Sequence, residues 1–430
     1  MQGLLQKGVS LTSKSGNSYT VEQRLGVGGQ GEVYKVTRDG CSYALKWYFK
    51  NSATNSQRQV LVNLIKKGAP SNVFLWPQEF LSMSENSFGY IMPLRPDKYK
   101  SIVDMMKRRA EPSFATLCRA AFNLAQGYNK LHAEGFAYRD ISFGNVFFDP
   151  DNGDVLICDN DNVSAASGIS SVYGTPRFMA PEIITGKAKP SRNTDLFSLA
   201  VLLFYMFMLN HPLEGRQEAK IKCMDIHAMN KLFGTNPIFI FDPNNDSNRP
   251  VEGLHDNATT FWPIYPQKLR DLFSASFTDG LSSPGKRVTE GQWMDIFINM
   301  MFGIVNCSCA AEVFYDESIV GSASETLCWY CNKPVNIPVL LASGKSSVIF
   351  YKNTNLYAHH VTGNYDIETV IGTTAQNPNN PSKWGIRNDS GVNWMYIKPD
   401  GTSIPVHKGK SAAIIKGAKI DFGQIIGEFK

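Results

Sequence analysis

Hydrophobic residues fall in short runs over residues 19–92 and at helical spacing from residue 114 onward. The short runs predict strands over 19–25, 32–37, 42–49, 74–83 and 88–92. One helix interrupts them over 57–67, where Val60, Leu61, Leu64 and Ile65 share a face before Gly68. A small lobe built mainly of strands therefore comes first.

A larger helical region follows, over 114–131 and again over 194–303. Its most apolar run, 196–209, has about 14 residues, fewer than the roughly 20 that a membrane-spanning helix needs. We therefore expect a buried core helix there. The segment 236–250 is rich in asparagine and proline, and we expect it to form a surface insertion.

Composition and charge exclude several classes of protein. The 430 residues are 43% hydrophobic and 12% aromatic, which is enough for a large core and excludes a mainly disordered chain. A formal net charge of +5 is too small to indicate a nucleic-acid-binding protein by itself. Residues 1–10 lack the apolar stretch of a secretory signal, so we expect a soluble, cytoplasmic protein without a membrane partner.

The glycine-rich segment 26–33, with the sequence GVGGQGEV, follows one predicted strand and opens directly into another. Glycines at this spacing let backbone N–H groups approach phosphate oxygens, because no Cβ is in the way. A dinucleotide-binding fold would need a helix after the glycines, so that interpretation fails. Taken alone, the segment fits a glycine-rich hairpin without a ligand equally well.

A lysine in the next predicted strand changes this balance. Lys46 follows Tyr43-Ala44-Leu45, and from a strand it can reach the α- and β-phosphates of a nucleotide, while the small Ala44 leaves space for a flat base. With these residues the chain resembles the eukaryotic-type protein kinases, whose other motifs can be sought in order.

Two of those motifs carry the catalytic groups. The sequence YRDISFGN over 138–145 resembles the kinase catalytic loop, with Asp140 and Asn145 at the required separation. A predicted buried strand, Val155 to Ile157, then leads to Asp159, where kinases carry Asp-Phe-Gly.

Three further motifs follow in the expected order. They are Ala180-Pro181-Glu182, then Asp195 at the start of the apolar helix, and then Arg287, where kinases place the arginine that pairs with that glutamate. Such an ordered series does not arise by chance. We therefore expect an α+β, bilobal protein kinase fold over residues 15–303, with the N-lobe over 15–93 and the C-lobe over 94–303.

The resemblance implies a role for each matched residue. Asp140 would receive the proton of the substrate hydroxyl, Lys46 would hold the α- and β-phosphates of ATP, and Asn145 and Asp159 would hold Mg²⁺. The residues implied to contact the nucleotide are Gly26, Val27, Gly28, Gly29, Gln30, Gly31, Val33, Ala44, Lys46 and Met92.

The chain departs from the kinase pattern at four places. No acidic residue lies between Lys46 and Trp76, so the helix glutamate that normally pairs with the lysine is missing, and we expect Gln59 in its place. Ser142 stands where a lysine is usual, and Tyr138 replaces the histidine before Arg139. Asn160 and Asp161 replace Phe-Gly.

The segment after Asp159 indicates the type of kinase and its regulation. Arg139 beside the catalytic aspartate suggests control by phosphorylation, because its charge needs an anionic partner. The candidate hydroxyls are Ser164, Ser167, Ser170, Ser171 and Thr175, although for any one of them an ordinary loop hydroxyl is the more common outcome. Gly174-Thr175-Pro176 resembles serine/threonine rather than tyrosine kinases.

Four of the eight cysteines are clustered within 304–335. Cys307 and Cys309 are followed by Cys328 and Cys331, which is the spacing of a zinc ribbon with a closed structural Zn²⁺ site. The alternative is a set of reduced thiols in a turn-rich linker. Trp329 and Tyr330 favour packing over stacking on a nucleic-acid base, because no basic run accompanies them.

Residues 336–430 alternate short β-rich runs with turns, and we expect a β-sandwich interaction domain. The segment 385–390 gives a weak resemblance to forkhead-associated domains, but the Gly-Arg pair and the serine of their phosphothreonine pocket are not evident. His359 and His360 are two candidates for the pocket histidine, although surface positions are the more common outcome for loop histidines.

The combination of the three parts is similar to bacterial kinases encoded beside stress-response and tellurite-resistance genes. That resemblance implies a 2C-type phosphatase and a von Willebrand A-like protein as partners, besides protein substrates. We expect an ATP- and Mg²⁺-dependent serine/threonine kinase. The alternative is a nucleotide-binding pseudokinase scaffold, which the missing helix glutamate favours. Nucleic-acid binding has only the cysteine spacing in its support.

Overall fold

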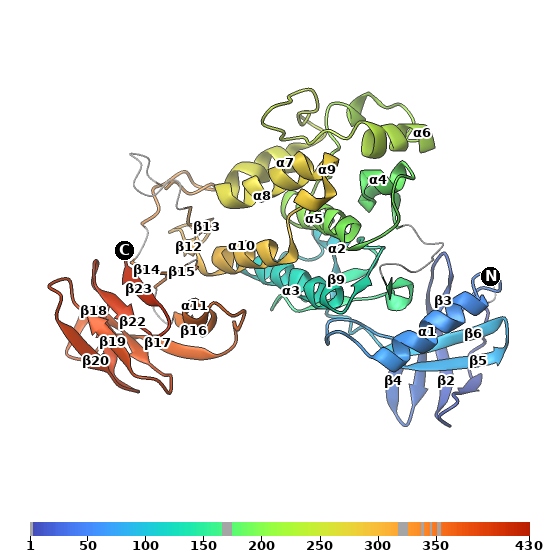
Figure 1. Ribbon diagram of the computed structural model, residues 1–430, viewed down its shortest axis with the longest axis horizontal. Coiled ribbons are helices and arrows are strands. Elements are labelled where there is room, and N and C mark those ends of the chain that lie inside the picture. Colours follow the sequence, from blue (N-terminus) through green and yellow to red (C-terminus); the bar gives the residue numbers. More distant parts are fainter. Residues whose placement is uncertain (1–2, 166–173, 317–325, 337–338, 345, 351–353) are drawn as a thin grey trace. The chain divides into compact units, whose positions relative to one another are not determined.

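The computed structural model describes residues 3–165, 174–316, 326–336, 339–344, 346–350 and 354–430 (Figure 1). The chain forms two compact units. The first runs up to Trp262 and includes Arg270–Met294, and the second comprises Pro263–Leu269 and Asp295–Lys430.

The first unit begins with a six-stranded antiparallel sheet of order β1-β2-β3-β4-β6-β5. Its strands are β1 (Ser10–Thr12), β2 (Ser18–Val27), β3 (Gly31–Arg38), β4 (Cys41–Tyr48), β5 (Glu79–Ser84) and β6 (Ser87–Pro93). The strand expected over 74–83 is shorter than predicted, because Phe74 instead forms an isolated parallel bridge with Ile157. Alternate residues of β2 and β3, including Tyr19, Val21 and Tyr34, are buried in the core of this sheet.

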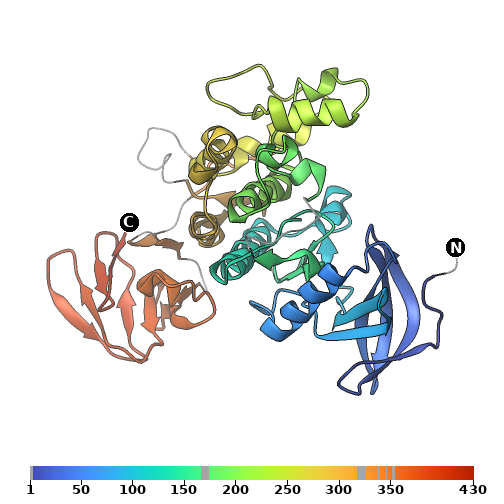
Figure 2. The same cartoon turned by 45° about the vertical axis from the view of Figure 1, so that its right-hand side comes forward.

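Helix α1 (Asn55–Lys67) lies beside this sheet in both views (Figure 2). Thr54 caps its first turn by accepting a hydrogen bond from the Gln57 N–H, and Gly68, at φ 82°, ends it. Leu61 and Leu64 are its buried residues. The indole N–H of Trp76 donates to the Leu64 carbonyl at 2.9 Å, which ties the end of the helix to the chain that leads into β5.

The rest of the first unit is mainly helical. Its helices and short strands are β7 (Lys100–Ser101), α2 (Ile102–Met106), α3 (Phe114–Ala133), β8 (Phe136–Ala137), β9 (Val146–Phe148), β10 (Val155–Ile157), β11 (Ser164–Ala165), α4 (Pro181–Ile184), α5 (Arg192–Met208), α6 (Ile226–Met229), α7 (Asp256–Phe261), α8 (Gln267–Phe277), α9 (Asp279–Ser282) and α10 (Glu290–Phe302), of which α8 and α10 continue into the second unit. Helix α5 is buried at every position from Thr194 to Met208, as the apolar run predicts. Among the described residues, none of the helices combines the length and the apolar character needed to cross a bilayer.

The segment expected as a surface insertion is partly buried instead. It contains no long helix or strand, but Phe239 and Ile240 are fully buried, and Phe239 packs edge-to-face on Phe204 of α5. The buried Asn248 amide donates to the carbonyls of Leu213 and Ile238, which folds the segment back onto the helical core.

The second unit carries two antiparallel sheets of order β15-β14-β23-β22-β19-β20 and β16-β17-β18-β21, preceded by a hairpin of β12 and β13. Their bounds are β12 (Ile304–Asn306), β13 (Glu312–Phe314), β14 (Leu340–Ser343), β15 (Ser346–Ile349), β16 (Asn355–Tyr357), β17 (Val370–Asn377), β18 (Asn380–Asn388), β19 (Trp394–Ile397), β20 (Ser403–Val406), β21 (Ser411–Ala413), β22 (Lys419–Asp421) and β23 (Ile426–Phe429). Leu341, Ile386 and Trp394 belong to one core that both sheets share. From Ile304 onward the described residues are therefore mainly β-strands and turns, with one short helix, α11 (His359–Thr362).

The expectation that His359 and His360 lie at the surface is wrong. Their exposed fractions are 2% and 1%, and both rings pack on Phe302 at the end of α10. Burial lowers the pKa of His359 to about 4, so the imidazole is neutral near pH 7. The pair begins a helical turn instead of lying in an open loop, and Val361 of the same turn belongs to the core that the two sheets share.

Candidate active site

The glycine-rich segment is the hairpin between β2 and β3. Its tip is closed by a hydrogen bond of 2.8 Å from the Gly28 N–H to the Gly31 carbonyl. A Cβ on Gly31 would lie only 2.2 Å from the Trp47 carbonyl oxygen, so only glycine lets β3 approach β4 this closely. By contrast, a Cβ on Gly26 or Gly29 would meet nothing within 4 Å. The backbone of the hairpin is therefore open toward the cavity described below.

Lys46 comes from the middle of β4, where Ala44 pairs with Met92 of β6. The lysine is 6% exposed and its ammonium contacts three side chains. It forms an ion pair with Asp159, a second with Asp161 at 2.9 Å, and a hydrogen bond of 3.2 Å to the Gln30 amide oxygen. The tip of the glycine hairpin is thus held to the same ammonium, and Gln30 also donates to Asn162 at 3.1 Å.

The charges in this group depend on one another. Burial alone would lower the pKa of Lys46, but the charges of Asp161 and Asp159 outweigh it and raise that pKa above its usual value. Burial and the Asp161 charge raise the pKa of Asp159 to about 6 against the opposing effect of Lys46. Lys46 and the Tyr48 hydroxyl overcome burial and lower the pKa of Asp161. Asp161 is therefore the firmer anion of the two.

The expectation that Gln59 orients Lys46 is wrong. Gln59 is exposed, and its amide donates to Asn63 one turn along α1. The helix residue that faces the site is Gln57, whose amide donates to the Tyr48 hydroxyl at 3.1 Å and to the Asp161 carbonyl at 3.0 Å. Gln57 precedes the buried Leu61 by four residues, whereas Gln59 falls on the opposite face.

Asp140 and Asn145 lie together in the loop that joins β8 to β9. The Asn145 amide donates to the Asp140 carbonyl at 2.8 Å and to the Asp140 carboxylate at 3.2 Å. Thr175 donates its hydroxyl to the other carboxylate oxygen at 2.7 Å. These hydrogen bonds hold the Asp140 carboxylate in one orientation.

The backbone of this loop is held in place by the side chain of Asp195, near the start of α5. Its carboxylate accepts hydrogen bonds from the N–H groups of Tyr138, at 2.6 Å, and Arg139, at 2.9 Å. Arg139 and Asp159 both adopt positive φ, 77° and 56°, a conformation that is uncommon outside glycine and clusters at functional sites. The Tyr138 hydroxyl donates to the Cys158 carbonyl, so the residue that replaces histidine joins the two catalytic segments.

The expected pair of Glu182 and Arg287 is confirmed. The guanidinium donates to both carboxylate oxygens, at 2.7 and 2.8 Å, and also to the carbonyl of Asn193 at 2.8 Å. The Arg287 side chain is 1% exposed, so this two-pronged contact is a buried one. It fixes the segment that begins α4 against the start of α5.

A cavity of about 830 Å³ joins these groups. All thirteen positions implied by the kinase resemblance line it. They are Gly26, Val27, Gly28, Gly29, Gln30, Gly31, Val33, Ala44, Lys46 and Met92, together with Asp140, Asn145 and Asp159. A cavity of this size suits a nucleotide.

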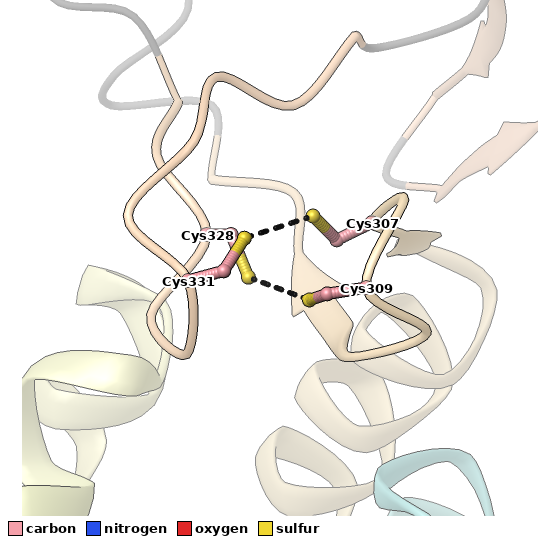
Figure 3. Close-up of side chains that lie close together, drawn as sticks. All are labelled: Cys307, Cys309, Cys328 and Cys331. Carbon is pink, nitrogen blue, oxygen red and sulfur yellow. Dashed lines mark hydrogen bonds between the residues drawn. The ribbon is translucent and has the colours of Figure 1, made fainter.

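The four clustered cysteines come from two tight turns (Figure 3). Cys307 and Cys309 flank the turn after β12, and Cys328 and Cys331 flank a second turn that is closed by the Asn332 N–H donating to the Cys328 carbonyl. The four sulfur atoms point toward one another and lie within 4.8 Å. None of the four cysteines forms a disulfide.

The spacing of these sulfur atoms fits a tetrahedral metal. The Sγ atoms of Cys307 and Cys331 are 3.6 Å apart, and those of Cys309 and Cys328 are 3.7 Å apart. Zinc–sulfur bonds of about 2.3 Å at tetrahedral angles require sulfur atoms about 3.8 Å apart. The four thiols therefore fit a Zn²⁺ ion, whose chemistry there would be structural because no coordination position is left open.

The surroundings of the cluster are consistent with packing by its aromatic residues. Trp329 donates its indole N–H to the Glu312 carbonyl at 2.7 Å, which joins the second turn to β13. Tyr330 packs edge-to-face on Trp329 and is 72% exposed.

The sequence matches the family model for the protein kinase domain over residues 19–279, well over half of the chain. The chain belongs to the protein kinase family. This kinase domain contains the cavity and every residue that lines it.

Curated kinases are similar over the same region. They include protein kinase C delta type from Rattus norvegicus, 27% identical over 47% of this chain, and the G2-specific protein kinase fin1 from Schizosaccharomyces pombe, 25% identical over 50%. A cell cycle serine/threonine-protein kinase from Saccharomyces cerevisiae is 24% identical over 50% of the chain. The chain spans only about a third of the length of these relatives: 31%, 35% and 32%.

Several residues of the kinase site are absent from the sequence-based expectations. Leu75, Phe147 and Cys158 also line the cavity, and Arg95 stacks on the Phe147 ring with its guanidinium carbon 4.1 Å from the ring centroid. For Asp161, the sequence indicates only a departure from the kinase motif. The signal that could have identified it is the acidic residue itself. A buried carboxylate needs a cation, and Lys46 is a cation that lacks its usual glutamate partner.

The structure describes only some of the candidate phosphorylation sites. Ser167, Ser170 and Ser171 lie outside the described residues. Thr175 is described, and its hydroxyl is occupied by the hydrogen bond to Asp140.

Proposed function

We propose that this chain is an ATP- and Mg²⁺-dependent protein serine/threonine kinase. The observation that carries the proposal is the cavity in which Lys46, Asp140, Asn145 and Asp159 converge beneath the glycine hairpin. Phosphoryl transfer requires the protein mainly to position groups and to balance charge, and these four residues offer one cation, two carboxylates and an amide for that purpose.

Each side chain has a role in this proposal. Lys46 binds the α- and β-phosphates, the hairpin backbone covers them, and Val33 and Ala44 enclose the adenine ring. Asp140 accepts the proton of the substrate hydroxyl, and its hydrogen bonds to Asn145 and Thr175 keep it oriented. Tyr138 and Asp195 keep the loop that carries Asp140 fixed to the strand that leads to Asp159.

The donor set of Asn145 and Asp159 fits Mg²⁺. Both side chains offer oxygen ligands, which this hard cation prefers, and the remaining positions are left to water and phosphate oxygens. When bound, the ion would offset charge on the phosphates. Asp159 would then exchange its contact with Lys46 for the metal.

Protein hydroxyls are the proposed substrates. The segment Gly174-Thr175-Pro176 supports serine and threonine over tyrosine, and the similar protein from Saccharomyces cerevisiae is a serine/threonine-protein kinase by name. The test is the transfer of radiolabelled phosphate from ATP by the purified chain and by its Asp159→Ala variant. We expect transfer by the wild type and a loss of at least about 10²-fold in the variant; equal transfer by both would contradict the proposal.

A second candidate is a nucleotide-binding scaffold without catalysis. It is favoured by one observation, which is that the described part of α1 offers no carboxylate to Lys46. Tight binding of Mg²⁺-ATP without phosphotransfer by the wild type would select this candidate.

Further parts of the proposal concern the C-terminal half. We place a zinc ribbon at 304–335 and a β-sandwich interaction domain at 336–430, after a kinase domain at 15–303. The β-sandwich resembles a forkhead-associated domain only in its later strands. A 2C-type phosphatase, a von Willebrand A-like protein, a cytoplasmic location and a bacterial stress-response setting rest on the resemblance alone.

A further inference from the structure

We infer that Asp161 replaces the missing helix glutamate as the positioning partner of Lys46. Tyr48 and Gln57 hold the aspartate in place. The inference rests on the proposed kinase function and adds a residue to its site.

The need for such a partner follows from the sequence. From Trp47 to Gln78 the chain contains no aspartate or glutamate, so neither β4 after the lysine nor α1 can supply a carboxylate. A lysine that is 6% exposed is nevertheless costly to bury unless an anion compensates its charge. The partner must therefore come from another segment.

Asp161 has the geometry of that partner. Its two carboxylate oxygens lie 3.0 and 2.9 Å from the Lys46 ammonium, and its side chain is fully buried. The Tyr48 hydroxyl, two residues after the lysine on the same strand, donates to the same carboxylate. The aspartate is thus bound by two neighbours on β4, which leaves it one orientation.

The two aspartates near Lys46 differ in access to the cavity. The Asp159 side chain is 32% exposed and lines the cavity, whereas the Asp161 side chain is 0% exposed and does not line it. Asp159 can therefore turn toward a metal ion and the phosphates. Asp161 cannot, so it stays on Lys46 and keeps the ammonium oriented when Asp159 leaves.

Helix α1 contributes through a neutral residue. Gln57 donates from one amide group to the Tyr48 hydroxyl and the Asp161 carbonyl, at 3.1 and 3.0 Å. In kinases generally, the position of this helix controls the lysine because the helix carries the glutamate. Here the carboxylate belongs to the same turn as Asp159, so the lysine and the metal-binding aspartate are set by one segment, and the helix only supports it.

The experiment measures phosphotransfer kinetics and the calorimetric affinity for Mg²⁺-ATP in the full-length chain. Asp161→Asn removes the charge and keeps the size, and we expect kcat to fall by about 10²-fold, because a misplaced phosphate contact costs about that much. The double variant Asp161→Asn/Gln57→Glu returns a carboxylate from the facing residue of α1, and we expect it to recover at least about 10-fold of that loss.

The matched control is Asp161→Asn/Gln59→Glu, which adds the same charge to the same helix on its exposed face. We expect no recovery there, and Gln59→Glu alone leaves the wild-type rate unchanged. Thermal unfolding of each variant identifies any that fail to fold, and Tyr48→Phe, which removes one donor to Asp161, gives a milder loss with the fold intact.

Three results would overturn the inference. They are an unchanged rate in Asp161→Asn, a faster rate, which would make Asp161 an inhibitory clamp on Lys46, and equal rates in the two double variants. If the wild type transfers no phosphate, the kinase proposal fails separately. The affinity for Mg²⁺-ATP still tests the role of Asp161 in that case. An affinity that is lost in Asp161→Asn and recovered only when Gln57→Glu is added supports the positioning role.

Discussion

Several charged residues of this kinase domain are buried together with groups of opposite charge. Lys46 lies between two aspartates, and Arg287 donates hydrogen bonds to Glu182. His132 of α3 contacts both Asp195 and Glu290. The His132 group supports the active site indirectly, because Asp195 is also the acceptor that holds the backbone of Tyr138 and Arg139. A buried pair of this kind is costly to break, since the remaining charge has no compensation.

His132 gives a pH dependence to stability. Burial alone would lower its pKa, but hydrogen bonds and charges from Asp195 and Glu290 raise it to about 9. Because this value lies above the 6.5 of an exposed histidine, the stabilisation is complete below about pH 6.5 and is lost as the pH rises through 9. We expect the melting temperature to fall between these values of pH.

The variant His132→Gln tests this origin of the effect. It removes the cation that Asp195 and Glu290 share, so that Glu290 keeps Arg192, at 2.7 Å, and Asp195 keeps only backbone N–H donors among its hydrogen bonds described above; we therefore expect a loss of about 3–5 kcal/mol in the free energy of unfolding. Its stability should change less with pH than that of the wild type. The exposed His227→Gln serves as control, and a pH profile identical in wild type and His132→Gln would refute the assignment.

At the scale of elements, the glycine hairpin depends on one close approach of two strands. Gly31→Ala would drive a methyl group against the Trp47 carbonyl, so we expect a loss of about 1–3 kcal/mol in stability and weaker Mg²⁺-ATP binding. Gly29→Ala adds the same methyl where nothing lies within 4 Å, and its stability should match the wild type. Chemical denaturation measures both, and equal stabilities would show that β3 can shift without cost.

The elements also show what the sequence could predict. Residues fixed by local spacing, such as Lys46, Asp140 and Asp159, reach one cavity as expected. The expectation for Gln59 is wrong because a missing glutamate does not by itself indicate which face of the helix points inward, whereas Leu61, four residues after Gln57, marks that face. The pairing of Asp161 with Lys46 joins residues far apart in the chain, and no local pattern encodes such a contact.

At the scale of the whole molecule, the second unit contains a small, cysteine-rich hairpin that packs against its strands. Cys307 and Cys328 are buried with Val313 in one cluster, while Val305, next to the hairpin turn, packs with Leu340 and Ile349 of the following sheet. The hairpin and the sheets therefore share apolar contacts. A metal that fixes the two cysteine turns would also stabilise the start of the β-rich region.

Zinc content tests this link. We expect about one Zn²⁺ per chain, with a contribution of about 10 kcal/mol to the folding of the cysteine turns. The double variant Cys328→Ser/Cys331→Ser should lose the metal, whereas Cys41→Ser, outside the cluster, should keep it. Elemental analysis gives the metal content; purified protein without zinc, or zinc retained by the double variant, would contradict the site.

The most direct measurement of the central claim compares wild type and Asp140→Asn in phosphotransfer and in Mg²⁺-ATP binding. Asp140 is held by Asn145 and Thr175 but has no part in binding the nucleotide phosphates in this account. We therefore predict a fall in kcat of about 10²–10⁴-fold with the affinity for Mg²⁺-ATP nearly unchanged. Phosphotransfer by Asp140→Asn at the wild-type rate would contradict the account.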